Sequence, residues 1–207
     1  MFITTEETPN PLTLKFIPVA NAKFGNDNRS FGGFFNSQSK ENHQFNNVNQ
    51  ASKVSPLAMQ IFQIKGVDSV FIARDFVTIT RNANLEWQNL KLEIIAVIID
   101  FIISGEPFFF EQPELEPAKE GTDGIEEDSE IVKQIKELIE IKVRPAVAMD
   151  GGDIIFHSFV DGIVRVTLKG SCSGCPSSTI TLKSGIEQML KHYVPEVVAV
   201  EQVEADY

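Results

Sequence analysis

The sequence has only two cysteines and one tryptophan among its 207 residues. A secreted scaffold held together by disulfides needs many more cysteines, so structural disulfides do not explain this pair. The sequence also lacks a long apolar run, because the most apolar stretch, 90–103, covers 14 residues and contains Lys91, Glu93 and Asp100. A membrane-spanning helix needs about 20 mostly uncharged residues. We therefore expect no membrane-spanning segment and no membrane partner.

Positive charge is scarce, with 18 Lys and Arg against 29 Asp and Glu and a net charge of −11. The surplus lies in 106–130, which holds ten acids and one lysine, whereas 1–105 holds nine of each sign. Nothing resembles a basic stripe, so we expect no nucleic-acid partner. The first seven residues are acidic and lack the regions of a signal peptide. The expected location is a bacterial-type cytoplasm, or the mitochondrial matrix if a presequence is missing.

Residues 1–105 predict a compact α+β domain. Apolar residues alternate with polar ones over 12–16, as in a half-buried strand. A serine followed by proline predicts a helix start, and β-branched residues predict a hairpin. The expected elements are a helix from Ser55 to Gly66, hairpin strands over 67–73 and 76–81, and a long helix over 87–104.

The stretch 21–52 differs from its surroundings because it contains eight asparagines. We expect a strand near Phe31–Phe35 followed by a polar loop. Residues 106–127 are rich in acids and proline, a composition typical of a solvated linker. Within this linker, Phe108-Phe109-Phe110 can dock onto either neighbouring domain.

Residues 128–207 predict a second domain with the element order α-β-β-α-β. Its first helix starts near Ser129 and is expected to break at Pro145 or a few residues later. The pair Asp161-Gly162 is a strong signal for a hairpin turn. The remaining expected elements are strands over 154–160, 163–169 and 197–203 and a helix from Pro176 to about Tyr193. The fold class is thus α+β in two small domains, the second with a three-stranded mixed sheet packed by helices.

The two cysteines, Cys172 and Cys175, lie in a Gly/Ser loop between a predicted strand and a predicted helix. Pro176 at the first helical position puts Cys175 at or beside the N-cap. The positive end of the helix dipole lowers the pKa of thiols there and favours thiolates, the form that binds metal. Ser173 and Gly174 allow the tight turn that brings two sulfurs onto one metal site.

Two thiolates supply only half of the four ligands that a zinc site or an iron–sulfur cluster requires. None of the histidines, His43, His157 and His192, has ligand spacing to the cysteine pair. Combining two chains supplies four thiolates, enough for a [4Fe–4S] cluster shared by a homodimer. A thiol–disulfide oxidoreductase and an interaction adaptor without metal remain the alternatives. The serine before Cys172 and the Ser-Gly centre argue weakly against the oxidoreductase.

The second domain resembles the Nfu family of NifU-like iron–sulfur scaffold and carrier proteins. The resemblance is carried by Arg144-Pro145, by Asp150-Gly151-Gly152-Asp153 and by the loop 170–178. The first domain is similar to that family's N-terminal domain, through residues 7–11 and 55–58 and the Gly66-Val67 pair leading to Val70-Phe71.

This resemblance implies a protein that is not an enzyme and that binds a [4Fe–4S] cluster between two subunits. It implies Cys172 and Cys175 as the ligands to iron. The expected partners are apo iron–sulfur proteins as recipients and the upstream cluster assembly machinery. Arg144, Asp150 and Asp153 are expected to support the turn and the loop.

Overall fold

The computed structural model describes residues 2–19, 42–110, 129–173 and 176–203, and the side chains of 176–179 are left out of the account. The chain divides into two compact units, unit 1 at 1–110 and unit 2 at 111–207. Each unit has a hydrophobic core of its own. Both units mix helices with a β-sheet, so the expected α+β class is confirmed.

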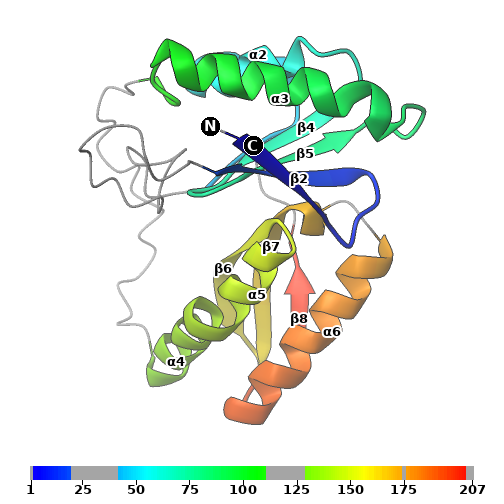
Figure 1. The fold of residues 1–207 in the computed structure, drawn as a ribbon. Coiled ribbons are helices and arrows are strands. Elements are labelled where there is room, and N and C mark those ends of the chain that lie inside the picture. The colour runs from blue at the N-terminus through cyan, green and yellow to red at the C-terminus, as the bar shows by residue number, and fades with distance from the viewer. Residues whose placement is uncertain (1, 20–41, 111–128, 174–175, 204–207) are drawn as a thin grey trace. The chain divides into compact units, whose positions relative to one another are not determined.

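Unit 1 is a five-stranded sheet with the strand order β1-β2-β5-β4-β3, and every neighbouring pair is antiparallel. Helices α2 and α3 lie over one face of this sheet (Figure 1). The elements are β1 (Phe2–Glu7), β2 (Thr13–Val19), β3 (His43–Phe45), α1 (Val48–Val54), α2 (Pro56–Phe62), β4 (Val67–Ile72), β5 (Val77–Arg81) and α3 (Trp87–Ser104).

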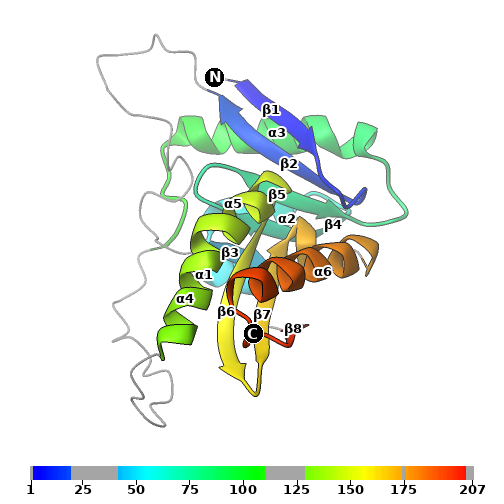
Figure 2. The same cartoon turned by 90° about the horizontal axis from the view of Figure 1, so that it is seen from below.

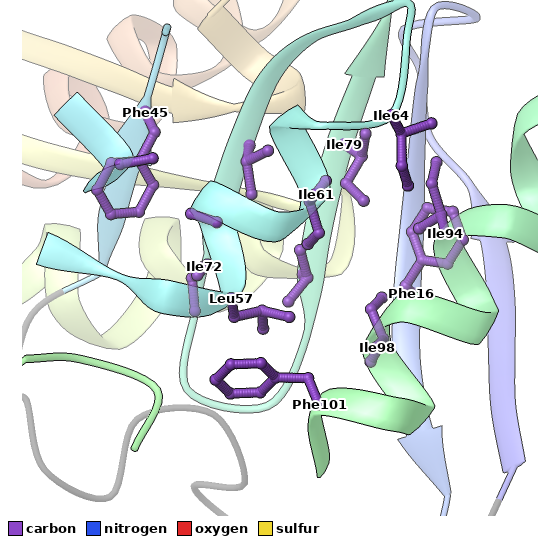
Figure 3. Close-up of a cluster of buried hydrophobic side chains, with 14 of the residues drawn as sticks. Phe16, Phe45, Leu57, Ile61, Ile64, Ile72, Ile79, Ile94, Ile98 and Phe101 are labelled. Carbon is purple, nitrogen blue, oxygen red and sulfur yellow. The ribbon is translucent and has the colours of Figure 1, made fainter. Parts of the chain in front are cut away.

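The core of unit 1 forms where one apolar stripe of α3 meets the sheet (Figure 3). Leu90, Ile94 and Ile98 recur at helical spacing and are buried. They meet side chains such as Phe16 and Ile79, which are completely buried on β2 and β5. The expected long helix is confirmed at both ends, and Gly105 ends it with a left-handed φ of 70°. The expected hairpin of β4 and β5 is confirmed as well.

Two expectations for the Asn-rich stretch have different outcomes. The strand near Phe31–Phe35 lies outside the described residues. The polar loop is wrong for its last part, where β3 and α1 form instead. Asn47 provides the reason for the helix, because its side chain accepts a hydrogen bond from the backbone N–H of Gln50 at 3.0 Å. Ala51 then anchors the short helix in the core.

The Phe108-Phe109-Phe110 segment packs onto unit 1. The Phe108 carbonyl accepts a hydrogen bond from Ser55 Oγ at 2.7 Å, and Phe110 N donates to the Val54 carbonyl at 2.9 Å. The ring of Phe109 is buried, with its centroid 4.7 Å from that of His43. The same Ser55 hydroxyl accepts from Ala58 N and caps α2, so one buried side chain joins the helix start to the segment.

Unit 2 is a three-stranded mixed sheet in which β6 pairs antiparallel with β7 and β7 pairs parallel with β8. Helices α4, α5 and α6 lie in front of these strands in Figure 1. The long β6–β7 hairpin is seen from below in Figure 2. The elements are α4 (Glu130–Leu138), a π-helical turn (Ile139–Val143), α5 (Arg144–Met149), β6 (Gly152–Val160), β7 (Ile163–Gly170), a 3-10 turn (Ser171–Ser173), α6 (Pro176–Tyr193) and β8 (Ala199–Gln202).

The predicted order of unit 2 and its mixed sheet are confirmed. The helical path passes Pro145 and ends at Met149, a few residues later, within the expected range. A proline in a regular helix lacks an N–H and its ring clashes with the carbonyl four residues earlier. The π-helical turn just before it widens the helix, and Arg144 N bonds to the Ile139 carbonyl five residues back. The turn thereby carries the helical path past the proline.

The β6–β7 hairpin turns at Asp161-Gly162, as predicted, and both residues have positive φ angles, 52° and 78°. At its other end, Gly152 lies opposite Gly170. The cysteine loop therefore leaves the sheet beside the Asp150–Asp153 turn that leads into β6. This geometry positions the candidate site.

Candidate metal centre at the cysteine loop

Cys172 lies in the 3-10 turn that joins the end of β7 to the start of α6. Gly170 ends the strand with a φ of 68°, a conformation that glycine adopts without strain. Ser173 Oγ donates a hydrogen bond to the Gly170 carbonyl at 2.8 Å and closes the turn on itself. The glycine and the serine together fold the chain sharply enough to place Cys172 against the sheet.

Ser171 fastens this loop to the neighbouring turn. Its backbone N–H donates to the Gly151 carbonyl at 3.2 Å, and its hydroxyl donates to the Asp150 carbonyl. The same hydroxyl oxygen lies 3.6 Å from Cys172 Sγ. Either the hydroxyl or the thiol can be the donor in this contact.

Gly152 makes the close approach of the cysteine to the turn possible. A Cβ atom at this residue would lie 2.8 Å from Cys172 Sγ and 2.6 Å from the Lys169 carbonyl oxygen. Both distances are shorter than a Cβ atom tolerates, so only glycine fits here without a shift. The backbone of β6 therefore covers one side of the sulfur.

Cys172 is consequently buried, with 4% of its surface exposed, and it belongs to the core of unit 2. Burial raises the pKa of its thiol, the hydrogen bond with Ser171 lowers it, and the nearby Asp150 carboxylate raises it further. The pKa lowered by the helix dipole was expected at the N-cap, at or beside Cys175, and stays a prediction. Cys172 sits in a buried turn ahead of the helix, where loss of water is the largest influence on its thiol pKa.

Cys175, the second expected ligand, lies outside the described residues. The expected helix after it is confirmed and begins at Pro176. The roles of both cysteines as ligands thus stay predictions. The donor chemistry fits the expected cargo, because cysteine thiolates are the usual ligands of iron–sulfur clusters.

The turn beside the cysteine loop is held by Arg144. The Nε atom of Arg144 lies 3.0 Å from Asp153 Oδ1, and an Nη atom donates to the Ile154 carbonyl at 3.0 Å. A further contact, 2.6 Å long, joins Arg144 to Glu140. The Asp153 carboxylate is buried and also accepts from Ile154 N at 2.8 Å. Arg144 and Asp153 support the turn, as expected.

The histidines are not brought to the cysteine loop by any contact in the described part of the chain. His43 lies on β3 against Phe109 in unit 1. His157 is exposed on β6, where its Nε2 lies 2.8 Å from Thr167 Oγ1, and the ring of His192 lies against Tyr193. Among the described residues, no group of three or more His, Cys, Asp or Glu side chains could hold a metal ion.

Two family models match the sequence, one in each unit. The model described as "Scaffold protein Nfu/NifU N terminal" matches residues 3–105, and the NifU-like domain matches residues 135–201. The human protein named "NFU1 iron-sulfur cluster scaffold homolog, mitochondrial" is 46% identical over 207 residues, which is all of this chain and 73% of the human protein.

The chain belongs to the Nfu family.

Other members of the Nfu family are similar over comparable lengths. The protein of the same name from Drosophila willistoni is 43% identical over all of this chain, which spans 65% of that relative. A solution structure of a NifU-like protein from Saccharomyces cerevisiae is 28% identical, with a TM-score of 0.42, and covers 53% of this chain and 85% of its own.

Unit 1 of this Nfu-family chain contains a cavity of about 540 Å³ between the β1–β2 connection and the start of α3. Trp87 lines it, and the Nε1 atom of this residue donates to the Pro11 carbonyl at 3.2 Å. In the part of the chain that the structure describes, no helix is long and apolar enough to cross a membrane.

Sequence reasoning missed the contacts that fix Cys172 in the Nfu-family loop. The sequence identifies Ser171 only as the residue before Cys172, and Gly152 only as part of the Asp150-Gly151-Gly152-Asp153 motif. The Gly151-Gly152 pair indicates that another segment approaches the backbone closely. The sequence does not show that this partner is Cys172, 20 residues further along the chain. Pairing of β6 with β7 is what brings the two together.

Proposed function

We propose that this protein is an iron–sulfur cluster scaffold and carrier. It binds a [4Fe–4S] cluster between two copies of the chain and delivers it to apo-proteins. Cys172 and Cys175 of each copy are the ligands in this proposal. The cluster is cargo, and the role is a binding and delivery role without catalysis.

The observation that carries the proposal is the similarity, over the whole of this chain, to relatives that are named iron–sulfur cluster scaffold homologues. The composition of the chain supports the sharing between subunits. Two cysteines per chain supply half of a four-thiolate shell, and no described cluster of other side chains completes it. A second copy supplies the missing half in an equivalent arrangement.

A shell divided between two chains suits transfer. Separation of the subunits removes two ligands at once, and the thiolates of a recipient protein can then replace them. A cage of four cysteines within one chain would hold the cluster more firmly. The proposed recipients are therefore apo iron–sulfur proteins, and an upstream assembly system supplies the cluster.

Anaerobic reconstitution with iron and sulfide tests the proposal. We expect about four irons and four sulfides for two chains, visible absorption, and a change from monomer to dimer on loading. Cys172→Ser and Cys175→Ser should each abolish colour and dimerisation, whereas His157→Ala should retain both. A cluster bound by one subunit alone, or a colourless protein, would contradict the proposal.

No observation favours the alternative of a thiol–disulfide oxidoreductase. Reactive cysteines in such enzymes are partly exposed and have lowered pKa values. Cys172 is buried and its thiol pKa is raised. Turnover with thioredoxin or glutathione, measured on the protein before reconstitution, would support that alternative.

Unit 1 is proposed to hold the recipient while unit 2 presents the cluster. The proposed domains are an N-terminal Nfu domain at 1–105 and the cluster domain at 128–207, joined by an acidic linker at 106–127. Separate cores in the two units support a division into two domains, and the Phe108-Phe109-Phe110 part of the proposed linker range packs on unit 1. Deletion of residues 1–105 should leave cluster binding intact and slow transfer to an apo-enzyme. Unchanged transfer would contradict the role given to unit 1.

The human and Drosophila willistoni relatives are mitochondrial proteins by name. Of the two expected locations, they favour the mitochondrial matrix over a bacterial-type cytoplasm. Fluorescence microscopy of the tagged protein in its own cells, beside a matrix marker, tests this proposal.

A further inference from the structure

The proposed ligand Cys172 is not accessible in the conformation that the structure describes. Its sulfur faces the backbone of Gly152 on one side, and only 4% of the residue surface is exposed. A thiolate that shares a cluster with a second chain must reach the protein surface. The turn Ser171–Ser173 therefore has to move before Cys172 can take part in a shared site.

Ser171 supplies the contacts that resist this movement. Its N–H and its hydroxyl bond to the carbonyls of Gly151 and Asp150, two adjacent residues of the neighbouring turn. The hydroxyl of Ser173, by contrast, bonds to Gly170, which belongs to the same loop. Of these two serine side chains, only that of Ser171 ties the loop to the Asp150–Asp153 turn.

The turn is a firm anchor for Ser171. Asp150 N and Gly151 N donate to carbonyls of α5, at 3.3 Å and 3.1 Å. Arg144 holds the following strand through Asp153 and the Ile154 carbonyl. Release of the two Ser171 bonds thus leaves the hydrogen bonds of the neighbouring turn and of the sheet in place.

We propose that Ser171 is a positioning residue that latches the turn Ser171–Ser173 closed, with the sulfur of Cys172 buried against Gly152. Opening of this latch exposes Cys172 and precedes acquisition of a cluster. The claim that opening precedes cluster binding rests on the proposed function. The claim that Cys172 alternates between a buried and an exposed position does not.

The test measures the accessibility of Cys172 in the metal-free, full-length chain. A Cys175→Ser background leaves Cys172 as the single thiol. Its rate of alkylation by iodoacetamide is measured over a range of pH in the native protein and in urea-unfolded protein. We expect the native plateau rate to be at least about tenfold below the unfolded rate, as local opening requires.

Ser171→Ala in that background should raise the native rate about fivefold, the effect of losing one ordinary hydrogen bond. Ser173→Ala removes a serine-to-carbonyl bond inside the loop and should change the rate less than twofold. Ser171→Thr, which retains a hydroxyl, should return the rate toward that of the parent. Comparing plateau rates over the pH range separates accessibility from a change in thiol pKa.

Low concentrations of urea distinguish a latch from general destabilisation. Local opening exposes little surface, so the alkylation rate should be almost independent of urea well below the unfolding transition. A steep dependence on urea would show that Cys172 reacts only through global unfolding and would overturn the proposal. A Ser171→Ala rate equal to that of Ser173→Ala would overturn it as well.

Reconstitution of Ser171→Ala, Ser173→Ala and Ser171→Thr in the chain that retains Cys175 keeps this inference separate from the proposed function. If Cys172 is latched but no variant binds a cluster, the carrier role fails and the latch stands. If all variants bind a cluster and the thiol reacts at the unfolded rate throughout, the carrier role stands and the latch is refuted.

Discussion

Replacement of Gly152 by alanine gives the sharpest test of how unit 2 is built. The added methyl group would lie 2.6 Å from the Lys169 carbonyl oxygen, 2.8 Å from Cys172 Sγ and 3.2 Å from Cys172 Cβ. The carbonyl belongs to the strand that pairs with β6, so it cannot withdraw without disturbing the ladder. We expect Gly152→Ala to lower the free energy of unfolding of unit 2 by about 2–3 kcal/mol, the upper range for overpacking.

Urea unfolding of the full-length chain measures this loss. The chain has one tryptophan, Trp87, and it lies in unit 1, so tryptophan fluorescence follows unit 1 and circular dichroism follows both units. The fluorescence transition should stay unchanged by Gly152→Ala while part of the dichroism transition moves to lower urea. Gly185→Ala is the matched control, because nothing lies within 4 Å of its added Cβ and it falls within helix α6. Alanine there should stabilise the unit by about 0.5–1 kcal/mol.

A double-mutant cycle assigns part of the loss to the sulfur. Cys172→Ala removes the Sγ contact and leaves the Lys169 carbonyl in place, so it should relieve some of the strain that Gly152→Ala creates. We expect a coupling of about 1 kcal/mol between the two changes. A Gly152→Ala protein as stable as the parent, or additive effects within about 0.5 kcal/mol, would refute the packing argument.

Three further predictions concern stability in urea. Arg144→Ala should destabilise unit 2 by about 2–3 kcal/mol, because it leaves the buried Asp153 carboxylate without its ion-pair partner. Arg165→Ala breaks only the partly exposed pair with Glu201 and should destabilise the unit by less than about 1 kcal/mol. Equal losses for the two variants would contradict this account. Phe109→Ala should destabilise unit 1 by about 3 kcal/mol and Phe110→Ala, whose ring is 42% exposed, by far less, as read by tryptophan fluorescence. Because burial raises the pKa of the Cys172 thiol, the folded state keeps its proton to higher pH than the unfolded state does. The stability that this thiol contributes is therefore complete when the pH is below the pKa of the thiol in the unfolded state. It declines as the pH rises from that value toward the pKa of the thiol in the folded state. The same decline in a Cys172→Ala protein would contradict this account.

Local sequence patterns predicted most of the fold. The bounds of helix α3 follow from its apolar spacing and from Gly105, and the β6–β7 turn follows from Asp161-Gly162. Such features depend on residues close together in the chain, where backbone preferences act directly. The end of the helix near Pro145 was predicted only to within a few residues, because the π-helical turn that accommodates the proline leaves no simple signal in the composition.

The sequence by itself determined the type of site: two cysteines, three residues apart, at the start of a helix, with no histidine at ligand spacing. Only the tertiary structure decided the environment of Cys172. Its burial, its raised thiol pKa and its contact with Gly152 arise from strand pairing that joins residues 20 positions apart. Composition and residue spacing do not predict this environment. The loss of water around the Cys172 side chain depends on every segment packed against it.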